Sequence, residues 1–326
     1  MSWRLVLLCL LALCWAVPAQ ADDNRPLSVQ IEALGEGVYA ARWKIPTNVA
    51  ARHVPQVAAD GCEATGHARN WSDPLGHWRD ERWQCAASPA EIAITYPAAN
   101  PALATIVRFN PEGEPVRTVV APAERERISL AGAEASATDW QGFLVLGLEH
   151  IWIGFDHLLF VAGLIFIAGT WQRVLVTITG FTVAHSITLA LSALDIVRLP
   201  IAAIEAVIAL SIVFLAVEIV KGPRDTLTWR RPVVVAAAFG LLHGFGFAAV
   251  LREIGLPDEG FVAALLAFNV GIEIGQVLFA AVVLGALQLL HRFGPAAAQG
   301  SAPRFAGYAV GTLASFWMIE RLAGAL

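Results

Sequence analysis

The sequence predicts a polytopic α-helical membrane protein with about six transmembrane helices, preceded by an N-terminal extracytoplasmic domain that is mainly β. Only 15% of the 326 residues are charged and 57% are hydrophobic, whereas soluble domains carry about 25% charged residues. Apart from a short apolar segment at the start of the chain, the apolar runs begin after residue 139. The net charge of −5 and the lack of a basic cluster give no reason to expect a nucleic-acid partner.

Residues 1–21 predict a cleavable signal peptide. Arg4 supplies a positive charge, and residues 5–17 form an apolar segment that is short for a membrane span. Ala19-Gln20-Ala21 has the small residues expected before a cut at Asp22. We therefore expect the segment that follows to be exported.

Residues 22–135 predict an extracytoplasmic β-rich domain. Apolar and polar residues alternate at 37–43, 90–96 and 105–109, and Pro and Gly separate these stretches, which is typical of β-strands. About 110 residues suffice for a small β-sandwich. After signal cleavage the chain keeps two cysteines, Cys62 and Cys85, and an oxidising compartment favours the one disulfide they can form. The sequence does not identify a partner for this domain.

Residues 136–326 predict a six-helix transmembrane domain, surrounded by a lipid bilayer. Apolar runs of about 20 residues, long enough to cross a hydrocarbon core about 30 Å thick, recur along this part of the chain. The expected spans are 140–168, 173–194, 200–220, 232–251, 259–290 and 304–323. The first and fifth are long, and Gly154, Gly271 and Gly275 are sites at which such helices would bend.

Basic residues in the loops predict the orientation of these spans. If the N-terminal domain is outside, seven basic residues lie inside and three lie outside, as the positive-inside rule requires. The inside set is Arg173, Lys221, Arg224, Arg230, Arg231, Arg292 and Arg304, and the outside set is Arg198, Arg252 and Arg321. We therefore expect a bacterial-type inner membrane protein whose N-terminal domain and C-terminus are both extracytoplasmic.

The predicted spans contain ionisable side chains, each of which costs about 2.5–3.5 kcal/mol at the bilayer centre. The candidate metal ligands are His150, Asp156, His157, His185 and His243. Their positions along the spans place the histidines near mid-bilayer, where transporters commonly bind substrates. Imidazole and carboxylate suit nickel, cobalt and zinc. Other polar residues are expected to orient these ligands or to line a pathway: Glu149, Ser186, Asn269, Glu273, Gln276 and Glu218.

The spacing of two of these histidines leaves the geometry open. His150 and His157 are seven residues apart, which in a straight helix separates them by about 10 Å along the axis, too far for easy binding of one ion. Either Gly154 marks a distortion that brings them together, or the two histidines occupy successive positions on a path. A third interpretation is that the histidines only form hydrogen bonds between packed helices.

The stretch His150-Ile-Trp-Ile-Gly154-Phe-Asp156-His157 resembles the His-Pro-x-x-Gly-x-Asp-His signature in the first helix of the HupE/UreJ family, with Ile151 in place of proline. Further similar stretches are Phe181-Thr-x-x-His185-Ser, His243-Gly-Phe-Gly-Phe-Ala248, Phe268-Asn269-x-Gly271-x-Glu273-x-Gly275-Gln276, Gly61-Cys62 and Trp83-Gln84-Cys85. The whole set looks most like the longer branch of the family, which adds an exported β-rich domain. The resemblance implies a permease for nickel or cobalt in which His150, Asp156 and His157 select the metal.

The sequence leaves three functions open. We favour a secondary transporter for a divalent transition metal, driven by an ion gradient or the membrane potential because the sequence shows no nucleotide-binding motif. The second is an intramembrane zinc-dependent hydrolase that acts on a lipid or a membrane peptide, with Asp156 or Glu273 as general base. The third is a non-enzymatic assembly or sensory protein.

Overall fold

The structure is a computed structural model that describes residues 26–46, 49–73, 76–97, 100–101, 103–130, 140–254, 260–293 and 296–324. The predicted signal peptide at 1–21 and the predicted domain boundary at residue 135 lie outside these residues.

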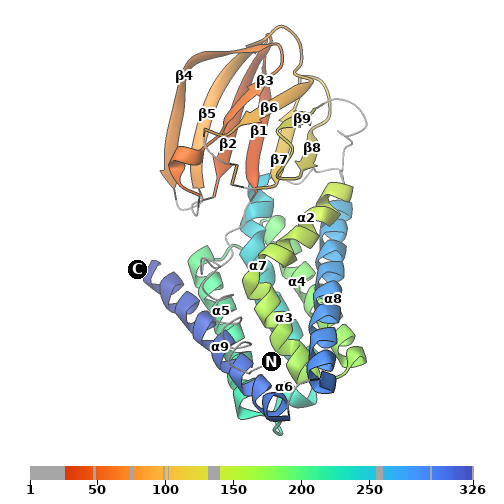
Figure 1. The fold of residues 1–326 in the computed structure, drawn as a ribbon. Helices are drawn as coiled ribbons and strands as arrows, with labels where there is room; N and C mark the ends of the chain where they lie inside the picture. Colours follow the sequence, from red (N-terminus) through yellow and green to blue (C-terminus); the bar gives the residue numbers. More distant parts are fainter. Residues whose placement is uncertain are drawn as a thin grey trace.

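The N-terminal domain is a β-sandwich (Figure 1). Its strands are β1 (Leu27–Gly35), β2 (Val38–Ile45), β3 (Gln56–Ala59), β4 (Cys62–Asp73), β5 (Gly76–Cys85), β6 (Glu91–Thr95), β7 (Thr105–Asn110), β8 (Arg117–Ala121) and β9 (Arg127–Ser129), with a short 3₁₀ helix at Ala51–His53. Six strands form one sheet in the order β4-β5-β2-β1-β7-β8, and three form another in the order β3-β6-β9. The described strand pairs are antiparallel except for β1 with β7.

Alternating side chains from both sheets form the core of the sandwich. Trp43 and Phe109 of the larger sheet pack in one buried cluster with Ile92 and Ile128 of the smaller sheet. The three predicted strands are present as β2, β6 and β7. Strand β6 buries every second residue, whereas β2 and β7 each also bury three consecutive residues at one end. The partial two-residue alternation was still enough to locate all three strands.

The predicted disulfide is confirmed. Cys62 and Cys85 are bonded to each other and face each other in the register of the β4–β5 hairpin. This hairpin is at the edge of the larger sheet, at the far side from β8.

The rest of the chain is helical. The helices are α2 (Trp140–Ile153), α3 (Phe155–Ala168), α4 (Trp171–Ala193), α5 (Ile201–Lys221), α6 (Leu227–Arg230), α7 (Pro232–Ile254), α8 (Phe261–Phe293) and α9 (Ala296–Gly324). Among the described residues, three helical segments are long and apolar enough to cross a membrane: Trp171–Ala193, Ala203–Lys221 and Phe261–Leu289. The bent pair α2 and α3 makes a fourth candidate. The protein is therefore a membrane protein with three to four candidate apolar spans.

The other two predicted spans are helical but do not meet the same test. Within α7, Pro232–Phe247 is a shorter apolar helix. Helix α9 is not among the candidate spans, and its charged residues include Arg304, Glu320 and Arg321. Six spans therefore stay a prediction.

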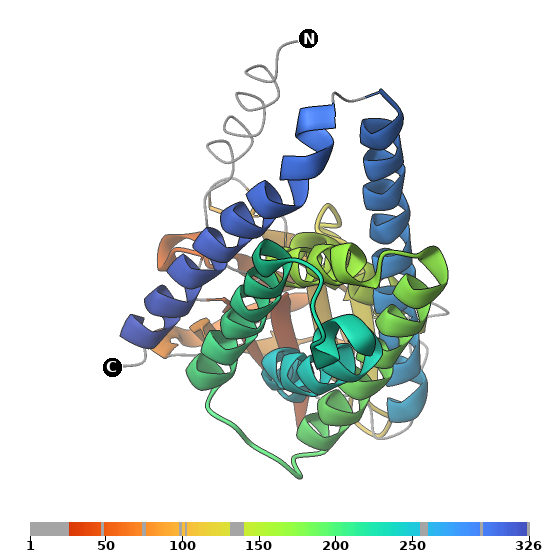
Figure 2. The same ribbon diagram turned by 90° about the horizontal axis from the view of Figure 1, so that it is seen from below.

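The helices pack mainly as three pairs: α2 with α8, α4 with α7, and α5 with α9. In the view from below, α9 diverges from α8 and runs beside α5 (Figure 2). Glycine allows two of these pairs to approach closely. A Cβ atom on Gly147 of α2 would collide with the backbone carbonyl of Phe268 in α8, and one on Gly244 of α7 would collide with Thr188 and the His185 carbonyl in α4.

The β-sandwich sits on one end of the helical region (Figure 1). Strands β1 and β7 contact α7, and β8 contacts α2. Ile106 of β7 is 1% exposed and belongs to one buried cluster with Phe143, Leu146 and Phe247 of the helices. Helix α6 lies at the opposite end (Figure 1).

Candidate metal centre

The first predicted span is broken at Gly154. Helix α2 ends at Ile153, α3 begins at Phe155, and their axes are bent by 74°. The backbone hydrogen bonds on either side are kept: the Gly154 N–H donates to the His150 carbonyl at 2.9 Å, and the Leu158 N–H donates to the Gly154 carbonyl at 3.0 Å. The break turns His157 back towards His150, so that their ring centroids are 4.7 Å apart. Of the two geometries left open by the sequence, the structure has the distortion at Gly154.

Asp156 fixes the orientation of His157. It lies in the first turn of α3, where a carboxylate is favoured by the helix dipole. One of its oxygens, Oδ1, accepts a hydrogen bond from the His157 backbone N–H at 2.8 Å and lies 2.9 Å from His157 Nδ1. A proton on Nδ1 leaves Nε2 of His157 with a lone pair for a metal, the usual arrangement of carboxylate, histidine and ion. Asp156 thus acts on the metal centre through His157.

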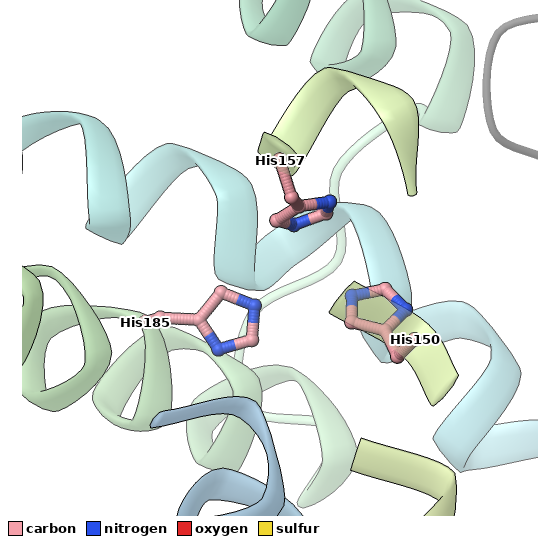
Figure 3. Close-up of side chains that lie close together, drawn as sticks. All are labelled: His150, His157 and His185. Atoms are coloured by element: carbon pink, nitrogen blue, oxygen red, sulfur yellow. The ribbon is translucent and has the colours of Figure 1, made fainter. Parts of the chain in front are cut away.

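Three histidines from three helices converge (Figure 3). His150 of α2, His157 of α3 and His185 of α4 each offer one nitrogen, and these three atoms lie within 4.8 Å of one another. Three nitrogens that each lie about 2.1 Å from one ion are about 3.4 Å apart in tetrahedral geometry. The most widely separated pair would therefore have to close by up to about 1.4 Å to bind one ion, a movement on the scale of a side-chain rotation. The arrangement can hold a late first-row divalent metal through neutral imidazole.

His243 lies beside this group. Its ring centroid is 5.1 Å from that of His157 and 5.3 Å from that of Phe181. Its Nε2 atom is 3.1 Å from the Ser211 hydroxyl oxygen. This hydrogen bond occupies one nitrogen of His243, and its Nδ1 has no hydrogen-bond partner in the described part of the chain.

These side chains are deeply buried. His185 is 0% exposed, His243 1%, and His157 and Asp156 4% each. By hydrogen-bond geometry, His150 Nε2 and both ring nitrogens of His185 lack a partner among the described residues, although the Asn269 amide lies next to His185. A buried polar atom without a partner costs about 1–3 kcal/mol. Coordination of a cation by these nitrogens would remove that cost. If the histidines only packed between helices, the cost would remain.

Three of the other predicted residues form hydrogen bonds between helices or within one helix. Thr179 donates to Glu273 Oε1 at 2.6 Å, which ties α4 to α8. Thr182 donates to Gln276 Oε1 at 3.0 Å, also between α4 and α8. The Ser186 hydroxyl donates to the Thr182 carbonyl at 2.7 Å within α4. Among the described residues, the side chains whose ligand atoms converge are those of His150, His157 and His185, and Ser186, Glu273 and Gln276 are not part of that group.

Glu218 lies away from the histidines, near the end of α5 opposite the β-sandwich (Figure 1). Its carboxylate accepts hydrogen bonds from Arg224 at 2.9 Å and from Thr226 at 2.8 Å. Its charge is therefore partly compensated by the loop that follows the helix.

The positive-inside count treated Arg321 as a free charge outside the membrane spans. In the structure it lies within α9 and pairs with Glu205. Its side chain is 8% exposed, and it donates to the Glu205 backbone carbonyl at 3.0 Å. The Arg321 guanidinium is also 3.8 Å from the Glu205 carboxylate. The ion pair joins α9 to α5, and Arg321 acts electrostatically on Asp156 and His243.

Glu149 faces the domain interface. Together with His150 it lines a pocket of about 230 Å³ between the β-sandwich and the helices. Glu124, in the turn between β8 and β9, lines the same pocket.

Sequence reasoning missed two residues of this region. Ser211 is a buried hydroxyl in the middle of an apolar helix, and that signal was available in the sequence. Glu124 has no such signal, because an acidic residue in a turn is ordinary. Its position beside Glu149 depends on how the two domains dock.

One comparison with known proteins gives a match. The sequence model of the family described as "HupE / UreJ protein" matches residues 126–321, which include the helices and every candidate metal ligand. Residues 26–125, which hold most of the β-sandwich, lie outside the match. No curated protein and no solved structure matches the chain. Because the family model covers more than half of the chain, the protein belongs to the HupE/UreJ family, with an additional N-terminal domain.

Proposed function

We propose that this protein is a secondary transporter, a permease that moves a divalent transition-metal ion, nickel or cobalt, across a bacterial-type inner membrane. His150, His157 and His185 would bind the ion, Asp156 would orient His157, and His243 would stand beside the ion path. The observation that carries the proposal is the convergence of three buried imidazoles from three helices. Within the described part of the chain, His150 Nε2 and both ring nitrogens of His185 have no hydrogen-bond partner by geometry. Family membership supports the same function, since the family is associated with nickel and cobalt.

The form of the cluster favours transport over hydrolysis. His150 and His157 stand on opposite sides of a break in the backbone, and the three nitrogens would have to close by about an ångström around an ion. A hydrolytic zinc centre needs ligands held in fixed geometry and an open position for water. A transporter needs a site that assembles and releases, because conduction requires binding weak enough for exit.

In the proposed orientation the β-sandwich and the C-terminus are outside. The basic residues between α5 and α7 would then lie on the cytoplasmic side. The structure places α6, which is part of that connection, at the end of the bundle opposite the β-sandwich (Figure 1). This placement agrees with the positive-inside rule.

The test is uptake of radioactive nickel and cobalt by proteoliposomes that contain the full chain. We expect saturable uptake by the wild type and at least a ~10-fold loss in His157→Ala, because a metal ligand is removed. The control is His67→Ala, an exposed histidine on β4. If the wild type takes up no metal but retains zinc that His157→Ala lacks, the permease proposal fails and a hydrolytic centre becomes the better hypothesis. If neither uptake nor binding occurs, the non-enzymatic assembly or sensory function remains.

A further inference from the structure

The pocket at the domain interface has both carboxylate and imidazole in its lining. Glu124 comes from the β-sandwich, and Glu149 and His150 come from α2. Leu103 of the sandwich and Phe247 of α7 supply apolar walls. The volume of about 230 Å³ is far above the ~10–15 Å³ that one water molecule needs on this measure. A divalent cation would therefore fit with most of its hydration shell.

The two carboxylates repel each other across this pocket. Two like charges that share a partly desolvated space are unfavourable, and a divalent cation between them reverses the sign of the interaction. Acidic residues alone would not define a site. Here the pocket also contains His150, which is 9% exposed and whose Nε2 has no hydrogen-bond partner among the described residues.

His150 belongs to two sites at once. It lines the interface pocket, and one of its nitrogens lies within 4.8 Å of the ligand atoms of His157 and His185. The pocket and the metal centre therefore adjoin through a single imidazole ring. An ion in the pocket reaches the metal centre by exchange at His150.

The β-sandwich holds Glu124 in a defined position. The turn that carries it is closed by a hydrogen bond from the Arg125 N–H to the Pro122 carbonyl at 3.0 Å. Asn100 Nδ2 donates to the Ala123 carbonyl at 2.8 Å and anchors the same turn to the domain. The exported domain thus places one carboxylate directly over the helical region.

We propose that Glu124, Glu149 and His150 form a first, weaker binding position for a hydrated divalent cation at the domain interface, and that the ion passes from it to the three-histidine centre. This inference rests on the proposed function for its direction of transfer, but the binding position itself is testable without transport. In this proposal the N-terminal domain takes part in ion capture through one of its own residues, Glu124.

The experiment combines binding and uptake on the full chain. Purified wild type is titrated with cobalt(II) by equilibrium dialysis, and the same preparations are reconstituted for uptake. The variants are Glu124→Gln and Glu149→Gln. The matched control is Glu126→Gln, an exposed acidic residue on the same turn that does not line the pocket.

We expect the wild type to bind one cobalt tightly at the three histidines and a second more weakly through Glu124 and Glu149, because a neutral His150 imidazole binds only one ion at a time. Glu124→Gln and Glu149→Gln should lose the weaker ion and raise the KM for uptake by about tenfold, the effect of removing one charge about 5 Å from a divalent ion in water. Maximal uptake rate should be unchanged, since the three histidines stay intact. The KM of the wild type should also rise with salt, and that of Glu124→Gln should rise less.

The outcomes separate the two proposals. Loss of the weak cobalt in Glu124→Gln without uptake by any variant supports the interface site and contradicts the permease. Uptake that depends on His157 but is identical in Glu124→Gln and Glu126→Gln, with equal cobalt stoichiometry, overturns the interface site and leaves the permease standing.

Discussion

Asp156 is the residue that orients His157 in the candidate metal centre. It is 4% exposed, and the same carboxylate oxygen contacts the backbone N–H and the ring Nδ1 of His157. With Asp156 ionised and the imidazoles neutral, the cluster has one negative charge, and a divalent cation turns it into one positive charge. The carboxylate therefore affects metal affinity through both orientation and charge.

Replacing Asp156 with Asn keeps the size of the side chain and removes the charge. We expect Asp156→Asn to lower the affinity for cobalt by about 10- to 100-fold, as is usual when the carboxylate behind a metal-bound histidine is lost. Cobalt titration of the purified protein measures this. Asp225→Asn is the control, because Asp225 pairs with Arg230 outside the bundle. Equal affinity in the two variants would show that Asp156 does not orient a ligand.

The types of candidate ligand were predictable from the sequence. Placing a charged or imidazole side chain in a membrane span costs free energy, so such residues are rare there and stand out in an apolar run. Which atoms face one another was not predictable. The rotation of each helix about its axis decides which side chains meet. Glu273 of α8 accepts a hydrogen bond from Thr179 of α4, whereas His185, also in α4, faces His157. Hydropathy carries no information on rotation, so the sequence grouped both kinds of residue as candidates.

At the scale of elements, the contact between α2 and α8 sets the position of His150. Gly147 is three residues before His150, and its Cα lies against the backbone carbonyl of Phe268. Any side chain at this position forces the two helices apart. The separation of α2 and α8 thus affects the position of His150, one of the three candidate metal ligands.

Gly147→Ala tests this dependence. We expect a loss of about 1–3 kcal/mol in stability, the usual cost of overpacking, and a weaker cobalt affinity because α2 moves away from α8. The measurements are the thermal-shift melting temperature in detergent and cobalt titration. Gly285→Ala on α8 is the control, since a Cβ there meets nothing within 4 Å. If Gly147→Ala and Gly285→Ala have the same melting temperature and the same cobalt affinity, α2 accommodates the added methyl group without moving His150.

The sequence located the elements better than it described their shapes. Apolar runs gave the positions of the helices, and alternation gave three strands, because both patterns reflect which side of an element is buried. The 74° bend was foreseen only as a possibility at Gly154. Its angle results from packing of α3 against α5 and of α2 against α8, which no local pattern contains.

At the scale of the whole molecule, the β-sandwich docks through an apolar contact that is distinct from its own core. Ile106 points to the helical region and packs near Phe143 and Leu146, whereas the next residue, Val107, is in the sandwich core. Adjacent residues of one strand therefore serve two different interfaces, as the pleat of a strand allows.

Ile106→Ala should weaken the docking of the two domains without unfolding the sandwich. We expect it to cost about 2–5 kcal/mol, the range for truncating a buried isoleucine, and to increase hydrogen–deuterium exchange at 103–106, 120–124 and 146–153. Val107→Ala should instead increase exchange within β1 and β2. If Ile106→Ala changes exchange only inside the sandwich, the apolar contact does not hold the domains together.

The break at Gly154 affects how the two histidines can move. Two side chains on one straight helix move together, whereas His150 and His157 lie on two helices, α2 and α3, that meet at Gly154. The distance between these two imidazoles therefore depends on the angle between α2 and α3 as well as on the rotamers of the two side chains. A wider angle would separate the rings without unwinding either helix, so a hinge motion at Gly154 could dismantle a pair of ligands.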